Sequence, residues 1–168
     1  MDDGSLASRR RVLGMLALGV SALAVGWQMR PGAVAAAAPT YPVHFTDAEW
    51  KQRLTAQQYA VLRQKSTEYP YTSPLNKEHR KGTFLCVADG NPLFSSSSKF
   101  DSGTGWPSFW KPLPGAVGTS TDHDLGYART EVHCRQCGGH LGHVFDDGPP
   151  PTGLRYCMNG VAMAFRPG

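Results

Sequence analysis

The sequence contains no internal repeat, no heptad pattern and no run of basic residues longer than the three arginines at positions 9–11. Repeat architectures and coiled coils are therefore excluded. The other lysines and arginines are dispersed rather than gathered on one segment, so nucleic-acid binding is not expected. The 168 residues are enough for one domain of ordinary size.

Long apolar stretches are also scarce, and the most extended, residues 12–29, lies near the N-terminus. Its glycines and Gln28 weaken it as a membrane span, although its length would just reach across a bilayer. It follows residues 8–13 (SRRRVL), which match the twin-arginine export pattern. We expect residues 1–37 to be a twin-arginine signal cleaved near Ala37, and residues 38–44 to be a linker. The predicted location is the periplasm, and the alternative is a membrane anchor formed by an uncleaved signal.

The formal net charge of +4 depends strongly on this segment. Residues 1–37 contain four arginines and two aspartates, and without them 13 basic and 11 acidic residues remain. The expected mature chain thus carries a charge of only +2, which adds to the argument against nucleic-acid binding.

The expected domain, residues 45–168, changes in composition near Glu68. Before this point, residues 46–49 (TDAE) and 55–58 (TAQQ) are capping-box patterns, so we predict two short helices that end by about Lys65. After it, proline, glycine, serine and asparagine recur every few residues, and apolar runs shorten to strand length. This pattern predicts a mainly β domain.

Several stretches are candidates for strands. The sequence ADGNP, in which Asp-Gly predicts a tight turn, is flanked by two candidates, residues 83–87 and the pair Leu93 and Phe94. The best candidates are residues 127–134 (YARTEVHC) and 161–167 (VAMAFRP), because large side chains alternate with small ones in the second.

The chain has only four cysteines, of which three fit a metal site. Cys134 and Cys137 have the C-x-x-C spacing of a tetrahedral Zn²⁺ site, and Cys86 and Asp89 repeat this spacing with a carboxylate as the second ligand. We therefore predict a zinc knuckle at these four residues. An Asp-Gly turn at Asp89, a redox disulfide between Cys134 and Cys137, and disulfides of an exported protein are the alternatives.

Cys157 has no place in such a metal site. In LRYCMNG, Arg155 brings positive charge two residues away, and His140 and His143 of GGHLGHVF are candidates to favour the thiolate or to donate a proton. The alternatives are a small buried cysteine and hydrogen-bonded core histidines. The acidic stretch at 121–127 (TDHDLGY) either approaches this site or forms a solvated turn.

Three longer motifs carry a resemblance to a known family. They are KFDSGTGWPSF at 99–109, RTEVHCRQCGGHLGHVFDDGP at 129–149 and GLRYCMNG at 153–160. In this order they resemble the B-type methionine sulfoxide reductases, which reduce the R epimer of methionine sulfoxide. The resemblance spans residues 45–165. It implies two antiparallel sheets in a barrel-like arrangement, with short helices at the N-terminal end.

The resemblance also implies a role for each residue of the site. Cys157 is implied as the nucleophile, and the residues implied around the sulfoxide oxygen are His140, His143 and Asn159. Trp106 is implied as the apolar wall against the substrate methyl group, although a core aromatic is the alternative. Together with Arg155, it makes up the predicted substrate-binding residues.

Two positions depart from the family pattern. Many members carry a resolving cysteine where this chain has Thr104, and zinc-containing members have cysteine in place of Asp89. Without a cysteine at position 104, a sulfenic acid formed on Cys157 has to be reduced by another thiol. We expect a thioredoxin-like protein or a small thiol to reduce it, and the alternative is an internal route through one of the remaining cysteines, Cys86, Cys134 or Cys137, in the absence of metal.

The sequence thus predicts an exported, monomeric oxidoreductase that reduces methionine-R-sulfoxide, mainly in oxidised proteins. A zinc-knuckle binding module without catalysis is the alternative from another class. A thiol-disulfide oxidoreductase that uses Cys134 and Cys137 is a third interpretation, but the chain lacks the βαβ pattern usual beside such a motif.

Overall fold

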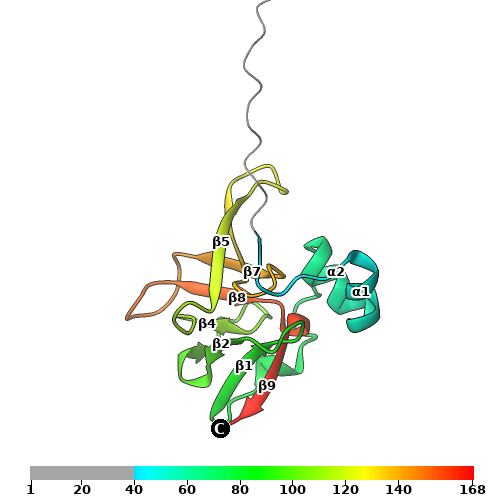
Figure 1. Cartoon of the computed structure of the whole chain (residues 1–168). Helices are drawn as coiled ribbons and strands as arrows, with labels where there is room; N and C mark the ends of the chain where they lie inside the picture. Colours follow the sequence, from blue (N-terminus) through cyan, green and yellow to red (C-terminus); the bar gives the residue numbers. More distant parts are fainter. Residues whose placement is uncertain (1–39) are drawn as a thin grey trace, which may run out of the picture. The chain divides into compact units, whose positions relative to one another are not determined.

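The computed structural model describes residues 40–168 (Figure 1). The predicted export signal, residues 1–37, lies outside the described residues, so its cleavage near Ala37 stays a prediction. Residues 40–46, which include most of the expected linker, form no helix or strand. Among the helices of the described part, none is long and apolar enough to cross a membrane.

Two short helices open the domain, and both begin at the predicted capping boxes. α1 covers Asp47–Arg53 and α2 covers Ala56–Gln64. At each N-terminus a threonine hydroxyl accepts a backbone N–H, and the side chain of Glu49 or Gln58 accepts the N–H of that threonine. These reciprocal bonds satisfy donors that a helix end leaves free. The two predicted helices are confirmed, and α2 ends just before Lys65.

The smaller sheet has three antiparallel strands in the order β2-β1-β9. The strands are β1 (Gly82–Cys86), β2 (Pro92–Ser95) and β9 (Met163–Pro167). β1 and β2 flank the predicted Asp-Gly turn, in which Gly90 has a φ of 74°, a conformation that favours glycine. The strand expected at 161–167 is shorter than predicted, because Gly160–Ala162 form the 3₁₀ turn η3.

The larger sheet has six antiparallel strands in the order β3-β4-β8-β7-β6-β5. These strands are β3 (Lys99–Phe100), β4 (Ser108–Phe109), β5 (Val117–Asp122), β6 (Arg129–Cys134), β7 (His140–Phe145) and β8 (Arg155–Met158). The 3₁₀ turns η1 (Pro74–Lys77) and η2 (Ser96–Ser98) precede β1 and β3. The predicted mainly β fold with two antiparallel sheets is confirmed, but the sheets are not closed into a barrel.

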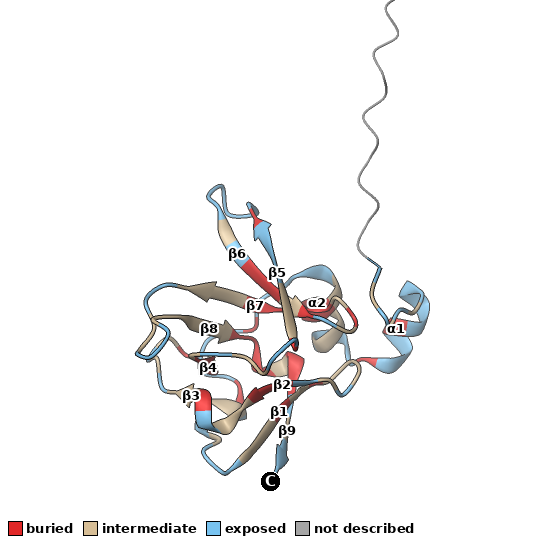
Figure 2. Ribbon diagram, turned by 60° about the vertical axis from the view of Figure 1, so that its left-hand side comes forward, coloured by how far each residue is buried: buried red, intermediate tan, exposed pale blue. Residues whose placement is uncertain are grey.

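An aromatic cluster joins the two sheets. Phe94 of β2 stacks on Phe109 of β4 with ring centroids 4.3 Å apart, and Phe84 of β1 meets the same ring edge-on at 4.9 Å. All three rings are fully buried, and Figure 2 shows buried residues, in red, on β1, β2 and β6. Burying such a ring contributes about 1.5–3 kcal/mol. The cluster therefore holds the small sheet against β4, the strand that pairs with β8.

Helix α2 packs against the segment that leads into β7. A Cβ built on Gly139 would lie 2.8 Å from the end of the Leu62 side chain, so a larger residue there would require that side chain to shift. Arg63 donates a hydrogen bond to the carbonyl oxygen of Cys137 at 3.0 Å. The helix thus contacts the loop that carries Cys137 and precedes His140.

Candidate active site and metal centre

Strand pairing in the larger sheet sets Cys157 beside His143. β8 lies between β4 and β7, and Cys157 is the register partner of Ser108 on one side and of His143 on the other. Gly142 allows β7 and β8 to approach closely, because a Cβ there would lie 2.1 Å from the carbonyl oxygen of Cys157. The sequence GHLGHVF therefore combines a histidine with the glycine that the neighbouring strand requires.

A pocket of about 140 Å³ opens beside the Cys157 side chain. Its lining residues are Thr67, Trp106, Arg129, Gly142, His143, Phe145, Cys157 and Asn159. Four of the six predicted active-site residues belong to this set, whereas His140 and Arg155 do not line the pocket. The pocket is smaller than a site for a drug-sized ligand, and it suits the end of one side chain.

Glu68 fixes Trp106 and Asn159 in this pocket. Its carbonyl oxygen accepts a hydrogen bond from Trp106 Nε1 at 3.1 Å, and its N–H donates to Asn159 Oδ1 at 2.9 Å. Its buried carboxylate accepts the N–H groups of Gly160 and Val161 at 2.6 and 2.9 Å. Burial raises the pKa of Glu68, and these two donors oppose the rise.

The acidic stretch TDHDLGY contributes Asp122 to the site, while His123 and Asp124 are exposed. Asp122 Oδ2 accepts hydrogen bonds from His143 Nε2, at 2.7 Å, and from Arg129. Hydrogen bonds from the Asp124 N–H and from His143 hold the pKa of Asp122 well below its usual range. Burial lowers the pKa of His143, and Asp122 opposes this effect. The ionised Asp122 only accepts, so His143 carries a hydrogen on Nε2, and its imidazolium form carries a second hydrogen on Nδ1.

His140 lies next to His143, with ring centroids 5.4 Å apart, but outside the pocket wall. Its Nδ1 is 2.8 Å from Glu131 Oε1, and Lys65 and Ser120 donate to Glu131 Oε2 at 2.7 and 2.8 Å. Burial raises the pKa of Glu131, but the hydrogen bonds from His140, Lys65 and Ser120 outweigh it and lower the pKa to about 2. An ionised carboxylate only accepts, so His140 Nδ1 carries the hydrogen. Its buried Nε2 has no partner among the described residues.

Arg155 forms a two-pronged ion pair with Asp147. Its Nε and Nη2 donate to the two carboxylate oxygens of Asp147, each at 2.8 Å. The guanidinium also lies over the Phe145 ring, 4.4 Å from the centroid. Asp147 raises the pKa of Arg155, and the neighbouring Cys157 adds to this rise. Arg155 therefore places positive charge beside the thiol without lining the pocket.

The Cys157 thiol lies at the end of a row of hydroxyl groups. Thr104 Oγ1 is 3.7 Å from Cys157 Sγ, and Ser102 Oγ lies 2.8 Å from Thr104 Oγ1 and 2.7 Å from Ser108 Oγ. None of the four cysteines forms a disulfide. The alternative of a disulfide-stabilised domain is therefore not realised in this structure.

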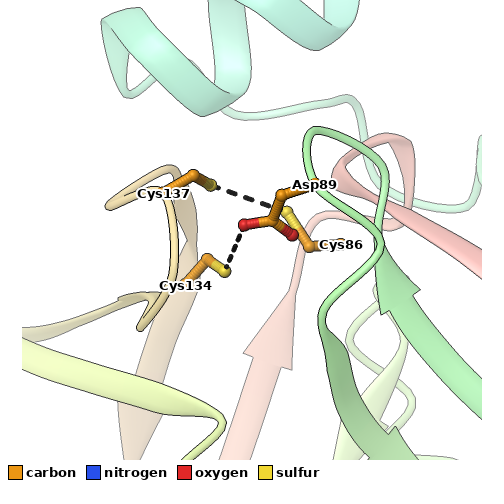
Figure 3. Close-up of side chains that lie close together, drawn as sticks. All are labelled: Cys86, Asp89, Cys134 and Cys137. Atoms are coloured by element: carbon orange, nitrogen blue, oxygen red, sulfur yellow. Dashed lines mark hydrogen bonds between the residues drawn. The ribbon is translucent and has the colours of Figure 1, made fainter. Parts of the chain in front are cut away.

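The other three cysteines and Asp89 form a compact cluster away from this thiol (Figure 3). Their ligand atoms all lie within 4.8 Å of one another. Cys86 Sγ and Cys137 Sγ are 3.8 Å apart, and Cys134 Sγ is 3.2 Å from Asp89 Oδ2. Two sulfur atoms at about 2.3 Å from a tetrahedral zinc ion would be about 3.8 Å apart. The cluster therefore has the donors and the spacing to hold a metal ion.

Two similar turns build the cluster. The N–H of Gly90 donates to the carbonyl oxygen of Cys86, and the N–H of Gly138 donates to that of Cys134, each at 2.9 Å. Both glycines are left-handed, with φ of 74° and 68°. Asp89 belongs to the first turn through Oδ1, which accepts a backbone N–H, while its Oδ2 faces Cys134. Asp89 can therefore belong to the Asp-Gly turn and also act as a metal ligand.

The three clustered thiols affect the charge of one another. Hydrogen bonds with Cys134 and Cys137 raise the pKa of Cys86, and hydrogen bonds with Cys137 and Cys86 lower the pKa of Cys134. The contact with Cys134 also raises the pKa of Cys137. Three adjacent thiolates would repel one another, whereas a divalent cation stabilises all of them. The donor set therefore fits a divalent cation.

Comparison with known proteins agrees with this geometry. Residues 54–167 match the family model of the SelR domain. A peptide methionine sulfoxide reductase MsrB of Agrobacterium fabrum is 53% identical over 126 residues, which cover 74% of this chain and 93% of the relative. MsrB proteins of Leptospira interrogans and Leifsonia xyli are each 52% identical, over 75% and 76% of this chain and 97% and 93% of the relatives. This chain belongs to the B-type methionine sulfoxide reductases.

Several residues of this B-type reductase site were not predicted from the sequence. Three of them, Thr67, Arg129 and Phe145, line the pocket. The other two are Glu68, which contacts Asn159, and Glu131, which contacts His140. Arg129 and Glu131 are two residues apart in RTEVHC, so a strand sends both side chains to one face. The alternation of these charged residues in RTEVHC, close to GGHLGHVF in the sequence, could have indicated that both belong to the site.

Proposed function

We propose that this B-type reductase converts methionine-R-sulfoxide, mainly in proteins, to methionine, with the Cys157 thiolate as nucleophile. The observation that carries the proposal is the pocket that Cys157 shares with His143, Asn159 and Trp106. Family membership and relatives named peptide methionine sulfoxide reductase support the same reaction.

In the first step the Cys157 thiolate attacks the partly positive sulfur of the sulfoxide. Methionine sulfoxide, the thiolate and one proton give methionine and a sulfenic acid on Cys157, so the substrate sulfur gains two electrons and the cysteine sulfur loses two. The proton reaches the oxygen from Nδ1 of the imidazolium form of His143, which becomes neutral, or from His140 through a water molecule. The unpartnered Nε2 of His140 is compatible with such a relay.

Other residues of the site orient the substrate. The Trp106 indole, held by the carbonyl of Glu68, forms the apolar wall for the S-methyl group. Asn159 already uses Oδ1 and one amide N–H, which donates to Leu141, so its second N–H is available to the sulfoxide oxygen. Arg155 places a positive charge beside the Cys157 sulfur.

The size of the pocket supports protein-bound substrate. Its volume of about 140 Å³ accommodates the end of a methionine side chain and leaves the substrate backbone outside. We also propose that the enzyme acts as a monomer.

We propose that an external thiol, from a thioredoxin-like protein or a small molecule, regenerates Cys157. The first thiol condenses with the sulfenic acid to a mixed disulfide and releases water, and a second thiol then restores Cys157. Two observations support this route: Thr104 faces Cys157, and the other three cysteines are gathered in the metal cluster. An internal route through one of those cysteines has no supporting contact.

We propose that the cluster of Cys86, Asp89, Cys134 and Cys137 holds a structural zinc ion. Bound zinc would link the turn after β1 to the turn after β6 as a closed tetrahedral site, with no position left for substrate. Asp89 in place of a fourth thiolate predicts weaker binding than a Cys₄ site.

We also propose that the twin-arginine pattern at residues 8–13 exports the protein to the periplasm, with cleavage near Ala37. This route exports folded proteins, so the metal would be bound before crossing. An uncleaved signal that anchors the protein to the membrane is the alternative.

Activity on the two separated epimers tests the reaction. With dithiothreitol as reductant, the wild-type enzyme should release methionine from a peptide carrying the R sulfoxide and not from its S counterpart, as measured by chromatography. Cys157→Ser should keep its melting temperature and lose about 10³-fold or more in kcat/KM, because a serine hydroxyl is a poor nucleophile without an activating base. R-specific reduction retained in Cys157→Ser would contradict the proposal.

Metal analysis tests the zinc site. The purified protein should contain one zinc ion per chain, and a strong chelator should lower its melting temperature by about 10 °C, since a ligand at 1,000 times its Kd contributes about 4 kcal/mol. Asp89→Ala should lose zinc more readily and Asp89→Cys less readily. Asp101→Ala, which removes a similar aspartate turn bond outside the cluster, is the control. Metal-free protein with an unchanged melting temperature would refute a structural zinc.

Thr104→Cys tests the route of regeneration. One equivalent of substrate, added without reductant, should produce a disulfide between the introduced cysteine and Cys157, because the Thr104 hydroxyl already contacts the thiol. The wild type and Thr104→Ser should instead give a sulfenic acid that dimedone traps, as read by peptide mass spectrometry. A wild-type disulfide between Cys157 and Cys86, Cys134 or Cys137 would favour the internal route.

Mass measurement of the exported protein tests the location. In a host with the twin-arginine pathway, the periplasmic form should begin just after Ala37, and a double Arg9→Lys, Arg10→Lys variant should accumulate as precursor in the cytoplasm. Arg30→Lys, outside the motif, is the matched control. A full-length wild-type protein recovered in the membrane fraction would favour the uncleaved anchor.

A further inference from the structure

The carboxylate of Asp122 connects two residues of the pocket. Its Oδ2 accepts hydrogen bonds from both His143 and Arg129, and both donors line the pocket beside Cys157. Asp122 ends β5 as the register partner of Arg129, and β6 separates it from the strand of His143. The side chains of Asp122, His143 and Arg129 are only 6%, 11% and 17% exposed. Water therefore screens this triad poorly.

Arg129 has donors left for a ligand. A guanidinium group carries five N–H donors, and the structure uses Nη2 for Asp122 while the buried Nε has no partner among the described residues. Arg155, by contrast, commits both Nε and Nη2 to Asp147 and does not line the pocket. Among the pocket residues, Arg129 is thus the one with a permanent positive charge.

We propose that Arg129 donates a hydrogen bond to the sulfoxide oxygen of the substrate, an inference that rests on the proposed function. Asp122 is then a positioning residue, which orients Arg129 and fixes the tautomer of His143. As the substrate sulfur accepts electrons, its oxygen gains negative charge. A preorganised guanidinium donor in a shielded pocket stabilises that charge. Asp122 acts through the two residues it holds, and it touches neither the thiol nor the substrate.

The tautomer of His143 follows from the same contact. Asp122 is ionised and can only accept, so it keeps the hydrogen on Nε2 and leaves Nδ1 as the second nitrogen. An asparagine at 122 could donate to Nε2 and favour the opposite tautomer. The loss of the carboxylate charge would also make the imidazolium form less favourable.

Asp122→Asn, with Asp124→Asn as its control, tests the positioning role. Asp124 lies in the same turn with an exposed side chain, and its substitution keeps the backbone N–H that Asp122 accepts. The charged or titratable groups around His143 are Asp122 from β5, Arg129 and Glu131 from β6, His140 from β7, and Cys157 from β8. Only the first of these changes in Asp122→Asn.

The experiment measures the pKa of His143 in each variant. Burial lowers the pKa of His143 and the Asp122 carboxylate opposes it, so Asp122→Asn should lower this pKa further, by about one unit or more. The alkaline limb of the kcat profile, where the proton donor is lost, should move to lower pH by a similar amount. NMR titration of His143 measures the first effect and initial rates measure the second. Asp124→Asn should show neither shift.

Substitutions of Arg129 test the oxygen site. Arg129→Met should lower kcat by about 100-fold, with a smaller change in KM, because the bond strengthens in the transition state. Arg129→Lys should recover part of this loss, since it keeps the charge but not the planar fork. A kcat of Arg129→Met equal to that of the wild type would overturn the role of Arg129.

The outcomes separate this inference from the proposed function. An unchanged His143 pKa in folded Asp122→Asn, or in Asp122→Ser if the first variant does not fold, would overturn the positioning role of Asp122. Wild-type enzyme that reduces neither epimer would instead refute the proposed function and with it the oxygen role of Arg129. The NMR titration, which needs no turnover, would still decide the contact between Asp122 and His143.

Discussion

The backbone pairing between β7 and β8 places the Cys157 thiol and the His143 imidazole side by side in the sheet, and the rest of the site is arranged around them. A slip of one residue would turn Cys157 or His143 to the opposite face. Gly142 permits the close approach of the two strands. On the other side β4 pairs with β8, and the Phe109 ring ties β4 to the smaller sheet. The position of Cys157 therefore depends on the packing of both sheets.

Buried acidic residues from three separate segments position the groups around this pair. The carboxylate of Asp122 holds His143 and Arg129, and that of Glu131 holds His140. Glu68 instead holds Trp106 and Asn159 through its backbone, while its carboxylate accepts the N–H groups of Gly160 and Val161. A buried carboxylate requires donors, so Asp122 and Glu131 also depend on the groups that they orient. The apolar wall of the pocket and the polar groups around it therefore depend on the same network of hydrogen bonds.

The sequence predicted what depends on neighbouring residues and missed what depends on long-range contacts. The capping boxes at α1 and α2 and the glycine turns of the cysteine cluster act within a few positions of the chain. The family resemblance predicted the two-sheet fold, which the structure confirms, and it implied that Cys157 is the nucleophile. Glu68 and Asn159 are 91 residues apart, and nothing local announces their contact. Asp122 remained undecided for the same reason, because its partner His143 lies two strands away. The two sheets are not closed into a barrel, because the edge strands of the larger sheet, β3 and β5, do not pair with each other.

The central claim is that the Cys157 thiolate takes the oxygen from the sulfoxide of a bound methionine. A single turnover without any reductant tests this most directly, with released methionine and the mass of the Cys157 peptide measured together. The account predicts one methionine per enzyme chain and one added oxygen atom on Cys157, with no oxygen on the other cysteines. Methionine formed without any change at Cys157, or an oxidised cysteine confined to the metal cluster, would contradict it.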